Sequence, residues 1–202
     1  MNKWITVVAA LAFVACGKKD GDKGGGGGGD KPSVTIDPAA ANAAVPAPLK
    51  DKLVFEKRDI VLERGKSKTT YTLAAPKGWT QEGKMFAHLK GDANAGFFTR
   101  LEVGSNCDGE CTPKDWEKVA DKVNFQPRTK GKVIKDDKGK GKRTMIAEVE
   151  SGGAKTTDVV VAWWTEGANK YYACTATLDE AIKDAAPAFE KACSAVNIDG
   201  DD

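Results

Sequence analysis

The stretch that decides the fold is residues 144–178, TMIAEVESGGAKTTDVVVAWWTEGANKYYACTATL. It contains three runs rich in β-branched and aromatic residues, Thr144–Glu150, Thr157–Trp164 and Tyr171–Leu178, and this composition is typical of strands. Clusters of turn-forming residues separate the runs. Together with the preceding run Lys132–Asp136, they predict a meander of four antiparallel strands.

Four more runs upstream have the alternating or β-branched pattern of strands. They are Ile60–Glu63, Thr69–Leu73, Met85–Leu89 and Phe97–Val103. Turn clusters follow several of these runs as well, so we expect an antiparallel sheet of about six to eight strands in total.

Two segments have the pattern of helices. The first begins at Thr112, which suits an N-cap, with Pro113 at the first helical position. The second spans Asp179–Val196 with one apolar face, and Pro187 is expected to kink or divide it. Two main helices packed on an antiparallel sheet predict an α+β sandwich, which we place at residues 52–198.

The order of these elements resembles that of a known family. The phrase Ala75-Pro76-Lys77-Gly78-Trp79 leaves an early strand, and a strand followed by a helix closes the domain over Tyr171–Val196. Both features resemble the PsbP-like fold family, which includes DcrB-like periplasmic lipoproteins. The resemblance implies an α+β sandwich that serves as a non-catalytic assembly, accessory or binding module. It implies no functional residue that can be transferred to this chain.

The N-terminus has the pattern of an export signal. A basic start with Lys3 precedes an apolar run from Trp4 to Ala15, which is too short to span a bilayer. The run ends in Phe13-Val14-Ala15-Cys16, which resembles the lipobox of bacterial lipoproteins. We therefore predict a signal peptide at residues 1–15 and acyl chains, including palmitate, on Cys16, which would anchor the protein in a membrane.

The residue after the cysteine bears on location. It is Gly17 rather than Asp, which favours the outer membrane of a bacterial envelope, facing the periplasm or the cell surface. Residues 16–51 contain the glycine run Gly24–Gly29 and an Ala/Pro-rich stretch with no apolar period, so we expect a disordered tether. Residues 199–202 form an acidic tail.

The charge balance gives no indication of a nucleic-acid-binding protein. The chain has 31 basic and 29 acidic side chains, a formal charge of +2. Removal of residues 1–15 takes away only Lys3 and leaves +1, so we expect no nucleic-acid partner.

Four cysteines remain after Cys16. Cys174 lies on the apolar face of the last strand, and Cys193 lies on the apolar face of the helix that follows. The rise of that strand and the return of the helix bring the two to the same level, so we predict a disulfide between them. Closing this loop would contribute roughly 3 kcal/mol.

Cys107 and Cys111 leave three interpretations open. They sit in NCDGECTP, residues 106–113, directly before a predicted helix N-terminus. The pair could form a local disulfide, act as a redox-active dithiol or bind Cu(I). The Cys-x3-Cys-x-Pro spacing resembles that of Sco-type copper proteins. Those proteins use a histidine after the motif, whereas His88, the single histidine here, precedes it.

The remaining polar residues do not predict an enzyme. A chain with one histidine and no Gly-x-Ser-x-Gly motif lacks the usual hydrolase triad, and we predict no cofactor. A basic hairpin could contact an anionic surface or could be a solvated edge that resists aggregation. Its residues are Lys132, Lys138, Lys140, Lys142 and Arg143.

Trp163 and Trp164 should point to opposite faces of their strand, so that an uncovered one would mark a contact site. The leading hypothesis is a tethered binding or accessory module for a protein partner or small ligand. The alternatives are a redox or copper-handling protein and a structural envelope protein.

Overall fold

The computed structural model describes residues 34–85, 87–106, 131–139, 141–151, 153–163 and 171–200. Within these ranges 56% of the residues are in strands and 15% are helical. The predicted α+β class with two main helices is therefore wrong, and the fold is mostly β. The expected antiparallel strand pairing is present.

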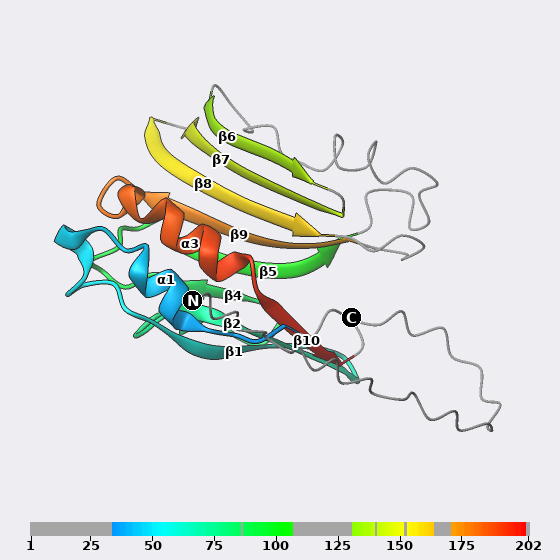
Figure 1. Cartoon of the computed structure of the whole chain (residues 1–202). Helices are drawn as coiled ribbons and strands as arrows, with labels where there is room; N and C mark the ends of the chain where they lie inside the picture. The colour runs from blue at the N-terminus through cyan, green and yellow to red at the C-terminus, as the bar shows by residue number, and fades with distance from the viewer. Residues whose placement is uncertain are drawn as a thin grey trace, which may run out of the picture.

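In the described part of the chain, ten strands form two antiparallel sheets (Figure 1). The three-stranded sheet has the order β1-β2-β10, and the seven-stranded sheet has the order β3-β4-β5-β9-β8-β7-β6. The strands are β1 (Phe55–Arg64), β2 (Ser67–Pro76), β3 (Thr80–Gln81), β4 (His88–Lys90), β5 (Arg100–Asn106), β6 (Gly131–Gly139), β7 (Lys142–Ser151), β8 (Ala154–Trp163), β9 (Tyr171–Asp179) and β10 (Val196–Gly200).

The predicted meander is the centre of the larger sheet. Strands β6 to β9 pair in sequence order, and β5 adds to the free edge of β9. One row of buried side chains crosses four of these strands, because Ile146 pairs with Val159, Val159 with Ala176, and Ala176 with Leu101. Alternation in the sequence thus places one apolar face of the meander on the core.

The predicted helix over Asp179–Val196 is much shorter in the structure. Residues Lys183–Ala185 form the 3-10 turn η2, residues Ala186–Cys193 form α3, and the chain then continues as β10. Pro187 lies in the first turn of α3, where its missing N–H costs no hydrogen bond, so it starts the helix instead of kinking it. Pairing of β10 with β2 takes the remaining residues into a strand.

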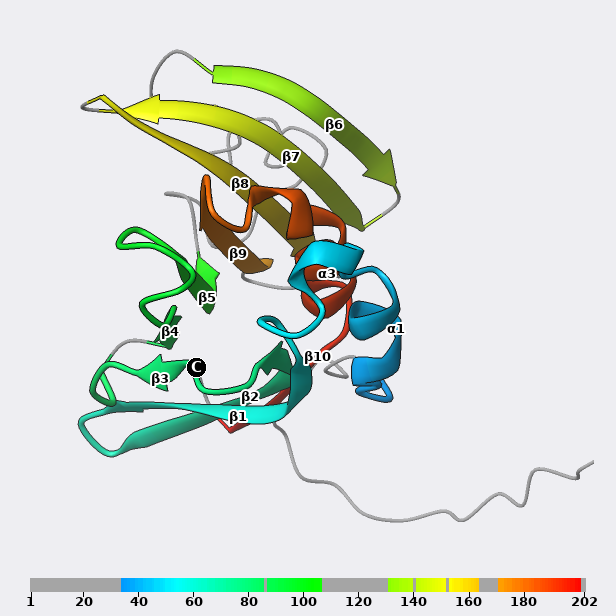
Figure 2. The ribbon, with the colours of Figure 1, turned by 90° about the vertical axis from the view of Figure 1, so that its left-hand side faces the viewer.

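The folded body begins before residue 52. Helix α1 (Pro38–Ala43) is capped by Asp37, whose side chain accepts from the Ala39 N–H, and the 3-10 turn η1 (Ala47–Leu49) follows. Ala41 and Val45 are buried in the core. The predicted tether, residues 16–51, therefore overlaps the fold from Val34 onward, because short alanines allow α1 to lie close against α3 (Figure 2).

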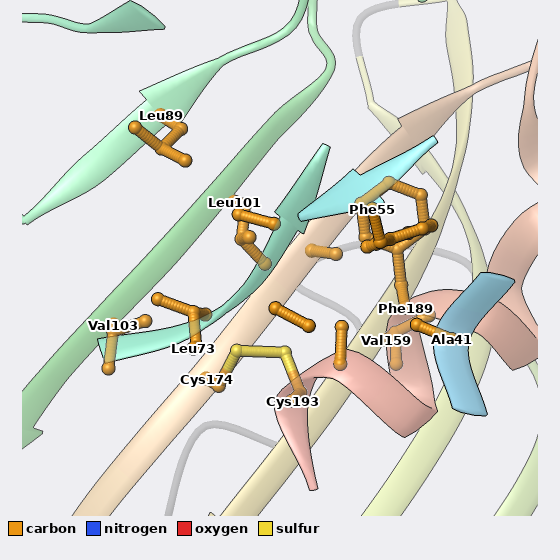
Figure 3. Packing of buried hydrophobic residues seen from close by; sticks show 14 of the residues in the cluster. Ala41, Phe55, Leu73, Leu89, Leu101, Val103, Val159, Cys174, Phe189 and Cys193 are labelled. Carbon is orange, nitrogen blue, oxygen red and sulfur yellow. A yellow bond between two sulfur atoms is a disulfide. The ribbon is translucent and has the colours of Figure 1, made fainter. Parts of the chain in front are cut away.

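The core lies between the two sheets and the helices (Figure 2). Phe189 of α3 is fully buried, with its ring centroid 5.1 Å from that of Phe55 and 5.5 Å from that of Trp79. Trp79 ends the sequence phrase APKGW, in which Gly78 turns the chain with a positive φ. Figure 3 shows Phe55 and Phe189 side by side in the core.

The predicted Cys174–Cys193 disulfide is present and joins β9 to α3 (Figure 3). Both cysteines are fully buried, and their Cα atoms are 5.3 Å apart. The bridge ties the last turn of the helix to the central strand of the larger sheet.

Several sequence predictions lie outside the described residues. They are the signal peptide, the lipidation site Cys16, the pair Cys107 and Cys111, the helix predicted from Thr112, and Trp164. Within the ranges given above, no helix is long and apolar enough to span a bilayer.

Candidate functional site

Two adjacent phenylalanines stand out on the surface. Phe97 is 78% exposed and Phe98 is 51% exposed. Both lie in residues 91–99 between β4 and β5, which we call the aromatic loop. Their rings pack edge to face, with centroids 5.1 Å apart and an interplanar angle of 89°. An exposed pair of large aromatic rings does not stabilise the fold by burial, so its presence calls for another explanation.

Hydrogen bonds within the aromatic loop fix its backbone. The Asp92 carboxylate accepts from the N–H groups of Asn94 at 2.9 Å and Ala95 at 3.1 Å. At the other end, the buried hydroxyl of Thr99 donates to the Ala95 carbonyl at 2.5 Å, and the Gly91 N–H donates to the Thr99 carbonyl at 2.8 Å. The loop is thus a closed turn with a defined shape.

Asp179, at the end of β9, holds the aromatic loop to the body. Its carboxylate accepts from the Phe98 N–H at 2.9 Å, and its own N–H donates to the Thr99 hydroxyl at 3.0 Å. Gly96 has a φ of +99°, and a Cβ on it would lie 2.1 Å from the Asp179 carboxylate. Only glycine fits there, so the presentation of both rings depends on this contact.

Ion pairs flank the two rings. The ammonium of Lys90 lies 5.7 Å from the Phe97 ring centroid and 3.3 Å from the Glu82 carboxylate. Glu82 also lies 3.5 Å from His88 Nε2, and the pKa of its carboxyl is lowered by His88 first and Lys90 second. Arg100 pairs with Glu102 at 3.3 Å. Lys90 and Arg100 therefore each have a carboxylate partner, and with the further carboxylates of Asp92 and Asp179 the named groups around the loop carry no excess of positive charge.

The arrangement of the aromatic loop suits binding. The loop offers a rigid apolar protrusion with a polar rim, which matches the centre of a protein interface. In the described part of the chain, no three His, Cys, Asp or Glu side chains gather as a metal ion would require.

The structure separates the residues of the predicted anionic-surface contact. Arg143 is buried, and its guanidinium forms two hydrogen bonds with the Asp136 carboxylate, at 2.8 and 2.9 Å. Lys132 and Lys138 are exposed on β6, whereas Lys142 is half-buried. Lys140 lies outside the described residues. The five predicted residues therefore do not form one exposed basic surface.

Other predicted candidates have structural roles or cannot be placed. Cys174 and Cys193 form a disulfide with each other and so are not free thiols. His88 is half-buried beside Glu82, at the rim of the sheet. Trp163 packs partly against the core. The alternatives for Cys107 and Cys111 stay open, since neither residue is described.

The aromatic loop itself was missed by the sequence prediction, which placed Phe97 in a strand. A usable signal existed in residues 91–99, GDANAGFFT, where turn-forming residues precede two adjacent phenylalanines. In a half-buried strand, two neighbouring large side chains cannot both face the core.

Comparison with known proteins adds no relative: no family model matches the chain, and the search of curated proteins finds no match.

Proposed function

We propose that this protein is a lipid-anchored lipoprotein of the bacterial envelope whose folded body is a non-catalytic binding module for a protein partner. The observation that carries the proposal is the aromatic loop, in which Phe97 and Phe98 are exposed on a backbone fixed by hydrogen bonds. Large aromatic side chains are enriched at interface hot spots. A loop that is already ordered loses little conformational entropy on binding.

The partner class follows from the rim of the loop. A loop that inserts into an anionic membrane would carry unpaired cations, each contributing about 1 kcal/mol near the surface. Here Lys90 pairs with Glu82 and Arg100 pairs with Glu102. A polar rim without an excess of positive charge around an apolar centre favours a protein surface with a pocket for the two rings.

The location rests on the cysteines. The lipobox-like sequence ending in Cys16 supports export and lipidation. The Cys174–Cys193 disulfide supports an oxidising compartment, since such bonds persist outside the bacterial cytosol.

A site-specific crosslinking experiment tests the binding role. A photoreactive phenylalanine at position 97 is expected to crosslink one envelope protein in living cells, whereas the same group at the exposed position Met85 is not. The captured protein is then purified, and its affinity for the full-length chain is measured. F97A/F98A should weaken that affinity by a factor of 100 or more. Equal crosslinking from both positions, or unchanged affinity in the double variant, would reject the proposal.

Vesicle binding separates the membrane alternative. Co-sedimentation of the full-length C16S variant with vesicles containing phosphatidylglycerol should be unaffected by F97A/F98A. If the double variant instead abolishes vesicle binding, the loop serves a lipid surface and the protein-partner proposal is wrong.

Mass spectrometry tests the anchor separately. The mature protein should begin at Cys16 with diacylglycerol and a further acyl chain, and C16S should leave the membrane fraction. An unacylated chain that begins at Met1 would contradict the anchor without affecting the binding experiment.

A further inference from the structure

A second cluster of side chains lies on the face of the larger sheet that α3 covers. Lys142 of β7 pairs in register with Trp163 of β8, and Trp163 pairs with Tyr172 of β9. Cross-strand partners share one face, with Cβ atoms roughly 5 Å apart. These strand ends lie at the end of the sheet toward which α3 runs (Figure 1). Together with Lys135 and Lys191, we call this cluster the lysine–aromatic face.

The two aromatic rings of this face are nearly parallel. The ring centroids of Trp163 and Tyr172 are 6.1 Å apart, with an interplanar angle of 19°. Both side chains are half-buried and pack against the core on one side. Their orientation is therefore fixed by packing, which makes them a preformed apolar surface.

Positive charge outweighs negative charge beside these rings. Lys135 lies 2.8 Å from the Glu190 carboxylate and 3.1 Å from the Asp137 carboxylate. Within the described residues, neither Lys142 nor Lys191 has an ion-pair partner. Lys142 lies in the field of Glu190, which attracts it, and of Lys191 and Lys135, which repel it. Two carboxylates, those of half-buried Glu190 and exposed Asp137, thus stand against three ammonium groups.

The half-buried position of Lys142 makes this excess of positive charge more costly. Burial lowers the pKa of its ammonium. Glu190 opposes this effect, and the charges of Lys191 and Lys135 add to it. A cation held away from water without a partner is energetically costly. An anion placed between Lys142 and Lys191 would remove that cost.

We propose that the lysine–aromatic face binds an anionic saccharide, with its carboxylate or phosphate between Lys142 and Lys191 and a sugar ring against Trp163 and Tyr172. The C–H groups on one face of a sugar ring pack well against aromatic rings, while its acidic group needs cations. A free inorganic anion would use only the lysines, and a neutral sugar would use only the rings. The combination of both features in adjacent strands selects a ligand that carries both.

This face is independent of the aromatic loop. Tyr172 lies near the start of β9, and Asp179, which holds the loop, lies at its end. Seven residues of strand separate them by roughly 23 Å, at about 3.3 Å for each residue. Variants at one end of β9 can therefore be tested without changing the other.

Calorimetric titration of the full-length chain with named probes tests the proposal. Tetragalacturonate is the probe with sugar rings and carboxylates, and glucose 6-phosphate is the probe with a sugar ring and a phosphate. Maltotetraose offers sugar rings without charge, and inorganic phosphate offers charge without a ring. At least one acidic sugar should bind saturably, and at least tenfold more tightly than maltotetraose or inorganic phosphate. Failure of both acidic sugars, or equal binding of maltotetraose, would overturn the proposal.

Variants then locate the binding on this face. K142Q should weaken the acidic sugar by tenfold or more and K191Q by threefold or more, while K183Q changes it less than twofold. Lys183 is the matched control because it lies before α3 and pairs with Glu180. W163L should weaken the sugar but leave the weak phosphate binding unchanged, and W163F should restore most of the affinity. If K183Q has the same effect as K142Q, the binding is non-specific attraction and the assignment is wrong.

Discussion

Phe189 and Phe97 make the same aromatic contact in opposite surroundings. The Phe189–Phe55 pair and the Phe97–Phe98 pair both have centroids 5.1 Å apart in edge-to-face geometry. Phe189 is fully buried, whereas Phe97 is 78% exposed. The contact geometry is therefore not what distinguishes them. Burial makes one pair a source of stability, and exposure leaves the other available for a partner.

The largest expected effect is at the buried pair. Phe189→Ala should lower the free energy of unfolding by about 3–5 kcal/mol, because it leaves a cavity among Phe55, Trp79 and α3. Urea unfolding followed by circular dichroism measures the change. A loss below about 1 kcal/mol would mean that the helix is not the centre of the core, and the contrast with Phe97 would fail.

The disulfide should have the next largest effect. The C174A/C193A double variant is expected to lose roughly 3 kcal/mol, since the bridge closes a loop with a sequence separation of 19. Thermal and urea unfolding would measure the change, with oxidised wild-type protein as the reference. An equally stable double variant would show that packing around α3 suffices without the bridge.

The glycine at the centre of the aromatic loop gives an intermediate effect. Gly96→Ala should cost about 1–3 kcal/mol through strain at positive φ and through the clash with Asp179. Faster hydrogen exchange at the amides of Phe98 and Gly91 would report the opened loop.

Gly104→Ala is the matched control, because a Cβ at Gly104 meets no atom within 4 Å and its φ is not positive. Equal exchange rates in the two glycine variants would mean that Asp179 does not hold the loop.

The Asp136–Arg143 pair adds a pH-dependent part to the stability of the body. Hydrogen bonds from Arg143 hold the pKa of the Asp136 carboxyl below its ordinary value. The carboxylate therefore stabilises the fold above pH about 4, and this contribution is lost as the pH falls through the lowered pKa.

Asp136→Asn should destabilise the protein at pH 7 and have progressively less effect toward pH 2. Asp137→Asn, at a neighbouring carboxylate that is 68% exposed, serves as the comparison. A constant difference between wild type and Asp136→Asn at all pH values would contradict the role of the ion pair.

The smallest stability effect is expected at the exposed rings. Phe97→Ala should change the free energy of unfolding by less than about 0.5 kcal/mol, as is usual for surface positions. The same urea titration used for Phe189→Ala provides the measurement. A loss above about 1 kcal/mol would show that the ring is part of the core in solution.

Local patterns were sufficient for most strands and for the disulfide. Alternation and turn residues predict eight strand segments, and the paired core residues Ile146, Val159 and Ala176 fall within three of them. The Cys174–Cys193 pairing was predicted from the apolar faces of strand and helix and from their rise, and the disulfide is present although the helix is shorter than that prediction assumed.

Long-range pairing explains what the sequence could not predict. The apolar face over residues 179–196 suits a helix, but β10 is a strand because β2 offers it an edge. Helix α1 lacks an apolar period and is stabilised by its contact with α3. The exposure of Phe97 depends on Asp179, which lies 81 residues from Phe98 in sequence.

The pairing of β2 with β10 also constrains when the molecule can fold. Tyr71 and Leu73 of β2 face Ile198 and Val196, which lie 127 and 123 positions further along the chain. Until β10 pairs, the smaller sheet is a lone hairpin, and two-stranded hairpins are marginally stable in water. Completion of this sheet therefore depends on closing a long loop of chain, and such long-range strand pairing is slow.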